Sequence, residues 1–155
     1  MSALLSQDDD VNSLVVDTDG NIYVVGNVSN LQAGEDFCVI KYDMSGNRVW
    51  IRFYNGSGNG DDYAASLTID KYNNIYITGG CYDIYGYIQI CTIKLNAEGE
   101  LLWANQHGVP FKDQGSGVDI AVDTMGNVYV AADIYNSWGD SDIGIIKYNS
   151  SGDTL

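Results

Sequence analysis

The chain has 155 residues, of which 45% are hydrophobic and 18% charged, enough for one folded domain with a sizeable core. Its 21 acidic and 7 basic residues give a net charge of −14, which argues against nucleic acids and anionic membranes as partners. No apolar run approaches the roughly 18 residues of a membrane span, and the segment MSALLSQDDD lacks the basic region and apolar length of a signal peptide. We therefore expect no nucleic acid partner and no membrane insertion.

One sequence unit recurs every 53 residues without insertion or deletion. Equivalent residues in the copies are Asp17, Asp70 and Asp123; Asn21, Asn74 and Asn127; Tyr23, Tyr76 and Tyr129; Ile40, Ile93 and Ile146; Lys41, Lys94 and Lys147; Gly46, Gly99 and Gly152; and Trp50 and Trp103. Self-similarity at a fixed period is the mark of a repeat architecture.

Each copy predicts short strands, A to D, rich in β-branched and aromatic residues and bounded by turn residues. In chain order they are residues 12–17, 21–28, 37–43 and 48–54, then 66–70, 74–80, 88–96 and 101–107, then 118–123, 127–133 and 143–149. No segment shows a helical period. The third copy lacks most of strand D.

The connections between strands are of two kinds. The A–B and C–D connections begin with Asp or Asn and have Gly or Asn in fourth place, which predicts tight turns with a left-handed fourth residue. The B–C and D–A connections, such as SNLQAGED, CYDIYGYI and QHGVPFKDQGSG, are longer and unlike one another. In an up-and-down meander they share one end, and variable loops on a rigid scaffold are where binding residues gather.

A four-stranded unit of about 50 residues is typical of a β-propeller blade. The run D-x-x-G-N-I/V-Y-V-x-G, followed by I-K-Y/L-D/N-x-x-G and L/V-W, resembles the SBBP family of β-propeller repeats over residues 11–155, and PQQ-type and NHL-type blades share parts of it. Trp50 and Trp103 look like the tryptophan of PQQ-type blades, but the rest of a cofactor site is not recognisable. The SBBP resemblance implies a propeller, often extracellular or at the cell surface, and no particular activity.

The expected architecture is all-β: one propeller domain over residues 1–155, with antiparallel repeats at about 11–63, 64–116 and 117–155. Three blades cannot close a ring, because propellers have about 4–8. Residues 1–10 fall in register after the missing strand D and are predicted to complete the last blade of a second copy. This predicts a homodimeric six-bladed ring, with a piece of a longer propeller as the alternative.

The candidate ligand contacts are aromatic residues of the B–C connections and one carboxylate of an inner strand: Tyr82, Tyr85, Tyr87, Tyr135, Trp138 and Asp119. Flat aromatic faces beside Asp and Asn suit sugar rings or protein anchors, and packing between blades is the alternative. Asp119 aligns with Ser13 and Ser66, so all three are expected to line the central channel.

Acidic residues of the variable face are candidate ligands for calcium, which prefers clustered carboxylates, and a solvated rim is the alternative. They are Asp36, Asp61, Asp62, Asp140 and Asp142, with Glu35 and Asp113 nearby. No other cofactor is predicted. The repeated lysines are expected to pack their stems along the sheet, and Cys38, Cys81 and Cys91 to be free, half-buried thiols.

The sequence favours binding over catalysis. His107 is the single histidine, and no metal-site spacing, nucleophile set or phosphate loop is present. We expect a non-enzymatic scaffold that binds a protein or a glycan through the variable face. A hydrolase or lyase that uses paired carboxylates on polysaccharide and an architectural repeat of a larger surface protein are the alternatives.

Overall fold

The computed structural model describes residues 9–30, 34–108, 114–135 and 140–155. These residues form eleven strands in three antiparallel sheets, and no helix long and apolar enough to cross a membrane lies among them. The strands are β1 (Asp10–Val16), β2 (Ile22–Asn30), β3 (Gly34–Tyr42), β4 (Arg48–Tyr54), β5 (Asp62–Ile69), β6 (Ile75–Tyr82), β7 (Ile88–Leu95), β8 (Leu101–His107), β9 (Gln114–Val122), β10 (Val128–Tyr135) and β11 (Ser141–Tyr148).

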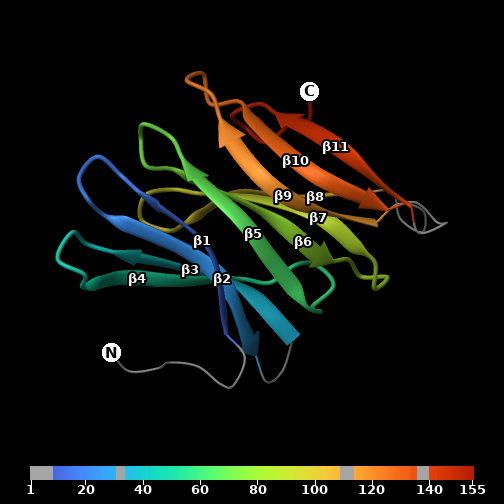
Figure 1. Ribbon diagram of the computed structural model, residues 1–155, viewed down its shortest axis with the longest axis horizontal. Coiled ribbons are helices and arrows are strands. Elements are labelled where there is room, and N and C mark those ends of the chain that lie inside the picture. The colour runs from blue at the N-terminus through green and yellow to red at the C-terminus, as the bar shows by residue number, and fades with distance from the viewer. Residues whose placement is uncertain (1–8, 31–33, 109–113, 136–139) are drawn as a thin grey trace.

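Each sheet is one propeller blade. Blade 1 is β1-β2-β3-β4, blade 2 is β5-β6-β7-β8, and blade 3 contains β9, β10 and β11, with every strand paired to its neighbours in sequence. Figure 1 shows the blades following one another in chain order, from blue through green to red. The predicted all-β propeller is therefore confirmed.

The tight turns are closed by one repeated set of hydrogen bonds. In the turn 70–74, the Oδ1 atom of Asp70 accepts the N–H groups of Tyr72 (2.8 Å) and Asn74 (3.0 Å), and Asn73 has a φ of 61°. The glycines in fourth place of the other predicted turns have φ between 79° and 92°. The left-handed fourth residue is thus confirmed.

A seventh turn of the same kind corrects the sequence analysis. Residues 83–87, expected to form a long variable connection, instead close a tight turn in which Asp83 Oδ1 accepts the N–H groups of Tyr85 and Tyr87, both at 2.9 Å. Gly86 takes the left-handed fourth place with φ of 81°. The signal was present in the sequence, because DIYGY also has Asp first and Gly fourth.

The inner strands begin earlier than predicted because each contains a β-bulge. The register of β1, β5 and β9 shifts at Asn12, Ala65 and Val118, which lie at equivalent places in the repeat. A bulge interrupts the alternation of inward and outward side chains, so the residues before it read as loop in the sequence.

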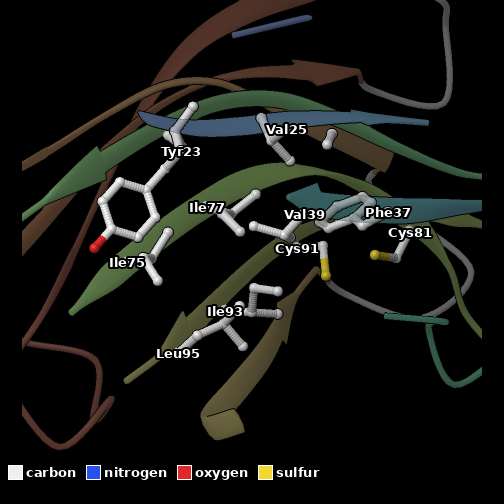
Figure 2. Packing of buried hydrophobic residues seen from close by; sticks show 12 residues of the cluster. Tyr23, Val25, Phe37, Val39, Ile75, Ile77, Cys81, Cys91, Ile93 and Leu95 are labelled. Atoms are coloured by element: carbon white, nitrogen blue, oxygen red, sulfur yellow. The ribbon is translucent and has the colours of Figure 1, made fainter. Parts of the chain in front are cut away.

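The core lies between the blades. One cluster joins blades 1 and 2 through residues such as Tyr23, Phe37, Ile75 and Ile93, as Figure 2 shows. A second joins blades 2 and 3 through Tyr76, Ile90, Ile120, Val128, Val130, Ile146 and Tyr148. Because neighbouring side chains of a strand point to opposite faces, blade 2 is apolar on both sides. We call the face of a blade toward the next blade its forward face and the opposite one its backward face.

The cysteines Cys38, Cys81 and Cys91 are free, as expected, but they are fully rather than half-buried. Cys91 pairs with Gly79 and Cys81 with Gln89, so the two thiols are diagonal neighbours across the β6–β7 hairpin. Burial raises the pKa of the Cys81 thiol far above its ordinary value. These thiols therefore act as small core side chains.

Candidate functional site

The repeated Asp–Asn–Tyr–Lys set builds the scaffold rather than a ligand site. In blade 2, Asp70 Oδ2 accepts hydrogen bonds from Asn74 Nδ2 (2.7 Å) and from the Tyr76 hydroxyl (3.0 Å), and Lys94 Nζ lies 5.0 Å from the centre of the Tyr76 ring. Lys94 Nζ also donates to the carbonyl of Ser150 in blade 3 (3.3 Å). Lys41 and Lys147 lie over Tyr23 and Tyr129 in the same way. The predicted structural role of the lysines is supported by these contacts.

An open hollow of about 620 Å³ lies on the loop face, between blades 1 and 2. It is formed where the end of the β2–β3 connection, the β4–β5 connection and the β6–β7 turn meet. Its lining consists of Gly34, Gly58, Asn59, Gly60, Asp61, Tyr82, Asp83, Ile84 and Gly86. Four glycines in this set leave backbone groups open to a ligand.

The hollow depends on glycine because its loops cross closely. Gly58 donates its N–H to the Tyr82 carbonyl at 3.0 Å, and a Cβ on Gly58 would lie 2.2 Å from the Asp83 carbonyl oxygen. Gly34 has a φ of 82° and lies against the Asp61 carboxylate. Side chains at these positions would push the loops apart and change the shape of the hollow.

The rim of the hollow is acidic. Asp61 Oδ1 accepts the N–H of Glu35 at 3.1 Å and so connects two loops. Burial, together with the negative charges of Asp61 and Glu35, raises the pKa of the neighbouring Tyr63 to about 12. Tyr63 therefore keeps its proton at neutral pH, and its hydroxyl donates a hydrogen bond to the Asp61 carboxylate. The combination of carboxylate acceptors and the Tyr82 side chain in the lining suits a ligand that carries hydroxyl or cationic groups.

The predicted aromatic contacts do not gather in one place. Tyr82 lines the hollow. Tyr85 is 54% exposed at the tip of the β6–β7 turn, and Tyr87 is partly buried after it. Tyr135, the equivalent of Tyr82 in blade 3, is 40% exposed at the end of β10. Trp138 lies outside the described residues.

Asp119 lies on the inner strand β9. Its Oδ1 atom accepts a hydrogen bond from the Ser66 hydroxyl at 2.8 Å, and so connects the inner strands of blades 2 and 3. The same oxygen accepts the N–H of Ile120 at 2.9 Å. A ligand contact at Asp119 stays a prediction, and its hydrogen bond from Ser66 lies between blades.

The predicted calcium ligands are divided among several places. Asp62 is fully buried and accepts the N–H groups of Gly56 and Tyr82 (3.2 Å). Burial raises the pKa of Asp62, and those backbone hydrogen bonds oppose the rise. Asp36 is buried and Asp61 lies on the rim of the hollow, whereas Asp140 and Asp142 lie at the start of β11 in blade 3.

Within the described ranges, no group of three or more His, Cys, Asp or Glu residues is placed to hold a metal ion. Asp113 falls outside these ranges. Calcium at Asp36, Asp61, Asp62, Asp140 and Asp142 therefore stays a prediction without an assembled set of ligands.

Comparisons with known proteins agree with this fold. The model of the SBBP family, described as a beta-propeller repeat, matches residues 4–27, in accord with the resemblance seen in the sequence. No curated protein matches the chain. Solved structures that match include the Hadza microbial sialidase Hz136, with a TM-score of 0.69 and 13% identity over 94% of this chain. The chain spans only 36% of that sialidase, and the likeness shows the propeller fold alone.

Proposed function

We propose that this chain is a non-enzymatic propeller scaffold that binds a protein or a glycan through its loop face. The observation that carries the proposal is the open hollow of about 620 Å³ between blades 1 and 2. Ligand sites are concave and combine an apolar or aromatic surface with a few placed polar groups. Tyr82 supplies the aromatic surface, and the carboxylates of Asp61 and Asp83 supply acceptors for hydroxyl or ammonium groups.

A carbohydrate-active hydrolase is the runner-up, and it has less support. Such an enzyme needs a carboxylic acid whose pKa is raised and which can reach the substrate. The pKa of Asp62 is raised, but Asp62 is fully buried and its oxygens accept backbone N–H groups. The sialidase likeness concerns a protein of which this chain spans 36%, and it supports no activity here.

We also propose an oligomeric state and a location for the scaffold. We expect it to act as a six-bladed ring of two copies, because three blades are too few for a closed propeller. We also expect an extracellular or cell-surface location, as the SBBP resemblance implies. Both expectations leave the hollow exposed, since it lies on the loop face between blades of one chain.

The test uses labelled protein on a glycan array and on a phage-displayed random peptide library. A ligand found in either is then titrated against Tyr82→Ala. We expect about tenfold weaker binding, which corresponds to about 1.4 kcal/mol, because the ring that faces the hollow is lost. Tyr72→Ala is the matched control, since Tyr72 is 70% exposed in an A–B turn outside the lining of the hollow. Binding that survives Tyr82→Ala, or no ligand in either library, would contradict the proposal.

A further inference from the structure

The two interfaces inside the chain use the same contacts at their outer ends. The indole N–H of Trp50 donates to the carbonyl of Ala97 in blade 2, and that of Trp103 donates to the carbonyl of Ser150 in blade 3, both at 3.3 Å. Two residues later, Arg52 and Asn105 donate to the carbonyls of Gly99 (3.1 Å) and Gly152 (2.7 Å). Each blade thus docks its forward face on the backward face of the next blade through equivalent hydrogen bonds.

The centre of each interface is apolar and fully closed. On the forward faces of blades 1 and 2, Phe37 and its equivalent Ile90 are exposed by only 0% and 3%. On the backward faces of blades 2 and 3, Leu67 and its equivalent Ile120 are each 6% exposed. The 53-residue repeat therefore defines which residues a third interface of this kind would use.

Both halves of such a third interface are exposed in a single chain. On the forward face of blade 3, Ile143 (the equivalent of Phe37 and Ile90) is 88% exposed and the neighbouring Ile145 is 68% exposed. On the backward face of blade 1, Leu14 (the equivalent of Leu67 and Ile120) is 62% exposed and Val11 is 74% exposed. Arrays that end in solvent carry polar outer faces on their terminal repeats. These terminal faces are apolar instead.

The outer end of the backward face of blade 1 is open as well. A Cβ on Gly99 or Gly152 would contact side chains of the preceding blade, Arg52 in one case and Trp103 in the other. A Cβ on the equivalent Gly46 would meet no atom within 4 Å. The C–D turn of blade 1 is therefore not covered by another blade, whereas the equivalent turns of blades 2 and 3 are covered.

We propose that the forward face of blade 3 docks on the backward face of blade 1 of a second copy, with Ile143 and Ile145 packed against Leu14. This inference deepens the two-copy ring of the proposed function and rests on it. A forward face and a backward face form a head-to-tail contact, and such contacts close into rings. Two copies close with six blades, within the usual range of about 4–8, whereas three copies would need nine.

The inner strands add a polar contact to the same interface. Ser66 donates its hydroxyl hydrogen to Asp119 of the next blade. In the proposed ring, the residue equivalent to Asp119 in the following blade is Ser13 of the second copy, whose hydroxyl can donate to a further lone pair of the Asp119 carboxylate. Asp119 would then join three successive inner strands.

The test is the mass in solution by light scattering after size exclusion, with three variants of equal charge change. The native chain is expected at about twice 16.9 kDa. Ile143→Asp and Leu14→Asp each place a carboxylate in the proposed contact and should weaken the dimer at least a hundredfold. Met125→Asp should leave the dimer intact, because Met125 is 78% exposed in an A–B turn of blade 3. Circular dichroism melting of each variant checks that it folds.

A mixture of the two disrupting variants tests the head-to-tail geometry. Ile143→Asp keeps its backward face on blade 1, and Leu14→Asp keeps its forward face on blade 3, so the mixture should regain a dimer with one intact interface. A native dimer that survives Ile143→Asp or Leu14→Asp would overturn this interface but leave the two-copy ring standing. A native chain that is monomeric at 100 µM, an order-of-magnitude ceiling for specific association, would overturn both. Ligand binding at the hollow is measured separately.

Discussion

At the scale of single residues, each turn aspartate accepts several hydrogen bonds that hold its hairpin together. Asp70 accepts four hydrogen bonds within its turn and from Tyr76, so it ties a hairpin to the middle of the sheet. Asp43 accepts the equivalent three bonds within its own turn, where Tyr76 has no counterpart. A comparison of substitutions at Asp70 and Asp43 therefore separates two contributions to stability. Both residues form a turn, but only Asp70 is also bonded to a tyrosine, in a partly buried contact.

Asp70→Ala is expected to lower the free energy of unfolding by about 2–3 kcal/mol, because it leaves several donors without their charged acceptor. Asp43→Ala should lower it by a smaller amount, because the hydrogen bonds of Asp43 are exposed and water competes for them. Urea denaturation with a common slope measures both. Equal losses for the two variants would show that the Tyr76 bond contributes nothing.

Asp70 also predicts a pH dependence with a definite sign. Burial raises the pKa of Asp70, but its hydrogen bonds from Asn74, Tyr72 and Tyr76 lower it more, and the result lies below the ordinary 3.8. A carboxylate whose pKa is lower in the folded state stabilises the fold above the unfolded pKa, and this stabilisation is lost as the pH falls through the folded value. The difference in stability between the native chain and Asp70→Asn should therefore shrink between pH 6 and pH 3. Asn96 and Asn149 show that asparagine can form this turn.

At the scale of strands and loops, the alternation of side chains along the chain predicts the strands. The bulges that interrupt this alternation are not predicted. The strands were found because Val, Ile and Tyr alternate between turns with Asp first and Gly fourth. The predicted starts of β5 and β9 lie four residues too late, because bulges at Ala65 and Val118 break the alternation. The prediction of a variable loop at residues 83–87 is wrong, although this segment carries the sequence signal of a tight turn.

The sequence predicts only part of the candidate site, because it reveals residue types but not contacts between loops. Tyr82 and Asp61 were recognised by residue type, and both line the hollow. Gly58 and Asp83 were not recognised, because their roles depend on two loops crossing within hydrogen-bond distance. Contacts between blades, such as Trp50 to the Ala97 carbonyl, also require the packing angle that a repeat pattern does not encode.

Blades 2 and 3 approach closely where Gly117 faces Thr78. A Cβ on Gly117 would lie 2.0 Å from Thr78 Oγ1, and Thr78 is fully buried with its hydroxyl donating to the Cys91 carbonyl. Gly117→Ala should therefore destabilise the fold by about 1–3 kcal/mol, as over-packing of a closed interior does.

The double variant Thr78→Ala with Gly117→Ala tests that cause. It should recover part of the loss relative to the sum of the single variants, because the shortened side chain makes room for the new methyl group. Thermal or urea unfolding of the four chains completes the cycle. Simple additivity would mean that the cost of Gly117→Ala arises elsewhere than at Thr78.

At the scale of the whole molecule, the exposed apolar faces favour association of two copies, whereas the net charge opposes it. The exposed forward face of blade 3 and backward face of blade 1 carry Ile143, Ile145, Leu14 and Val11, and their burial favours association. Each copy also carries a net charge of −14, so two copies repel each other at long range. The proposed ring must therefore owe its stability to short-range apolar packing.

This balance predicts that salt strengthens the dimer. The Debye length falls from about 30 Å at 0.01 M to about 8 Å at 0.15 M ionic strength, so salt screens the repulsion between copies. Salt has no comparable effect on the contact of Ile143 and Ile145 with Leu14, because apolar packing does not depend on charge. We expect the dimer dissociation constant, measured by sedimentation equilibrium, to fall about tenfold between 10 mM and 150 mM NaCl, equal to about 1.4 kcal/mol. Met125→Asp, which adds one negative charge away from the interface, should steepen this dependence slightly. A dissociation constant that rises with salt would mean that ion pairs, rather than the apolar faces, hold the copies together.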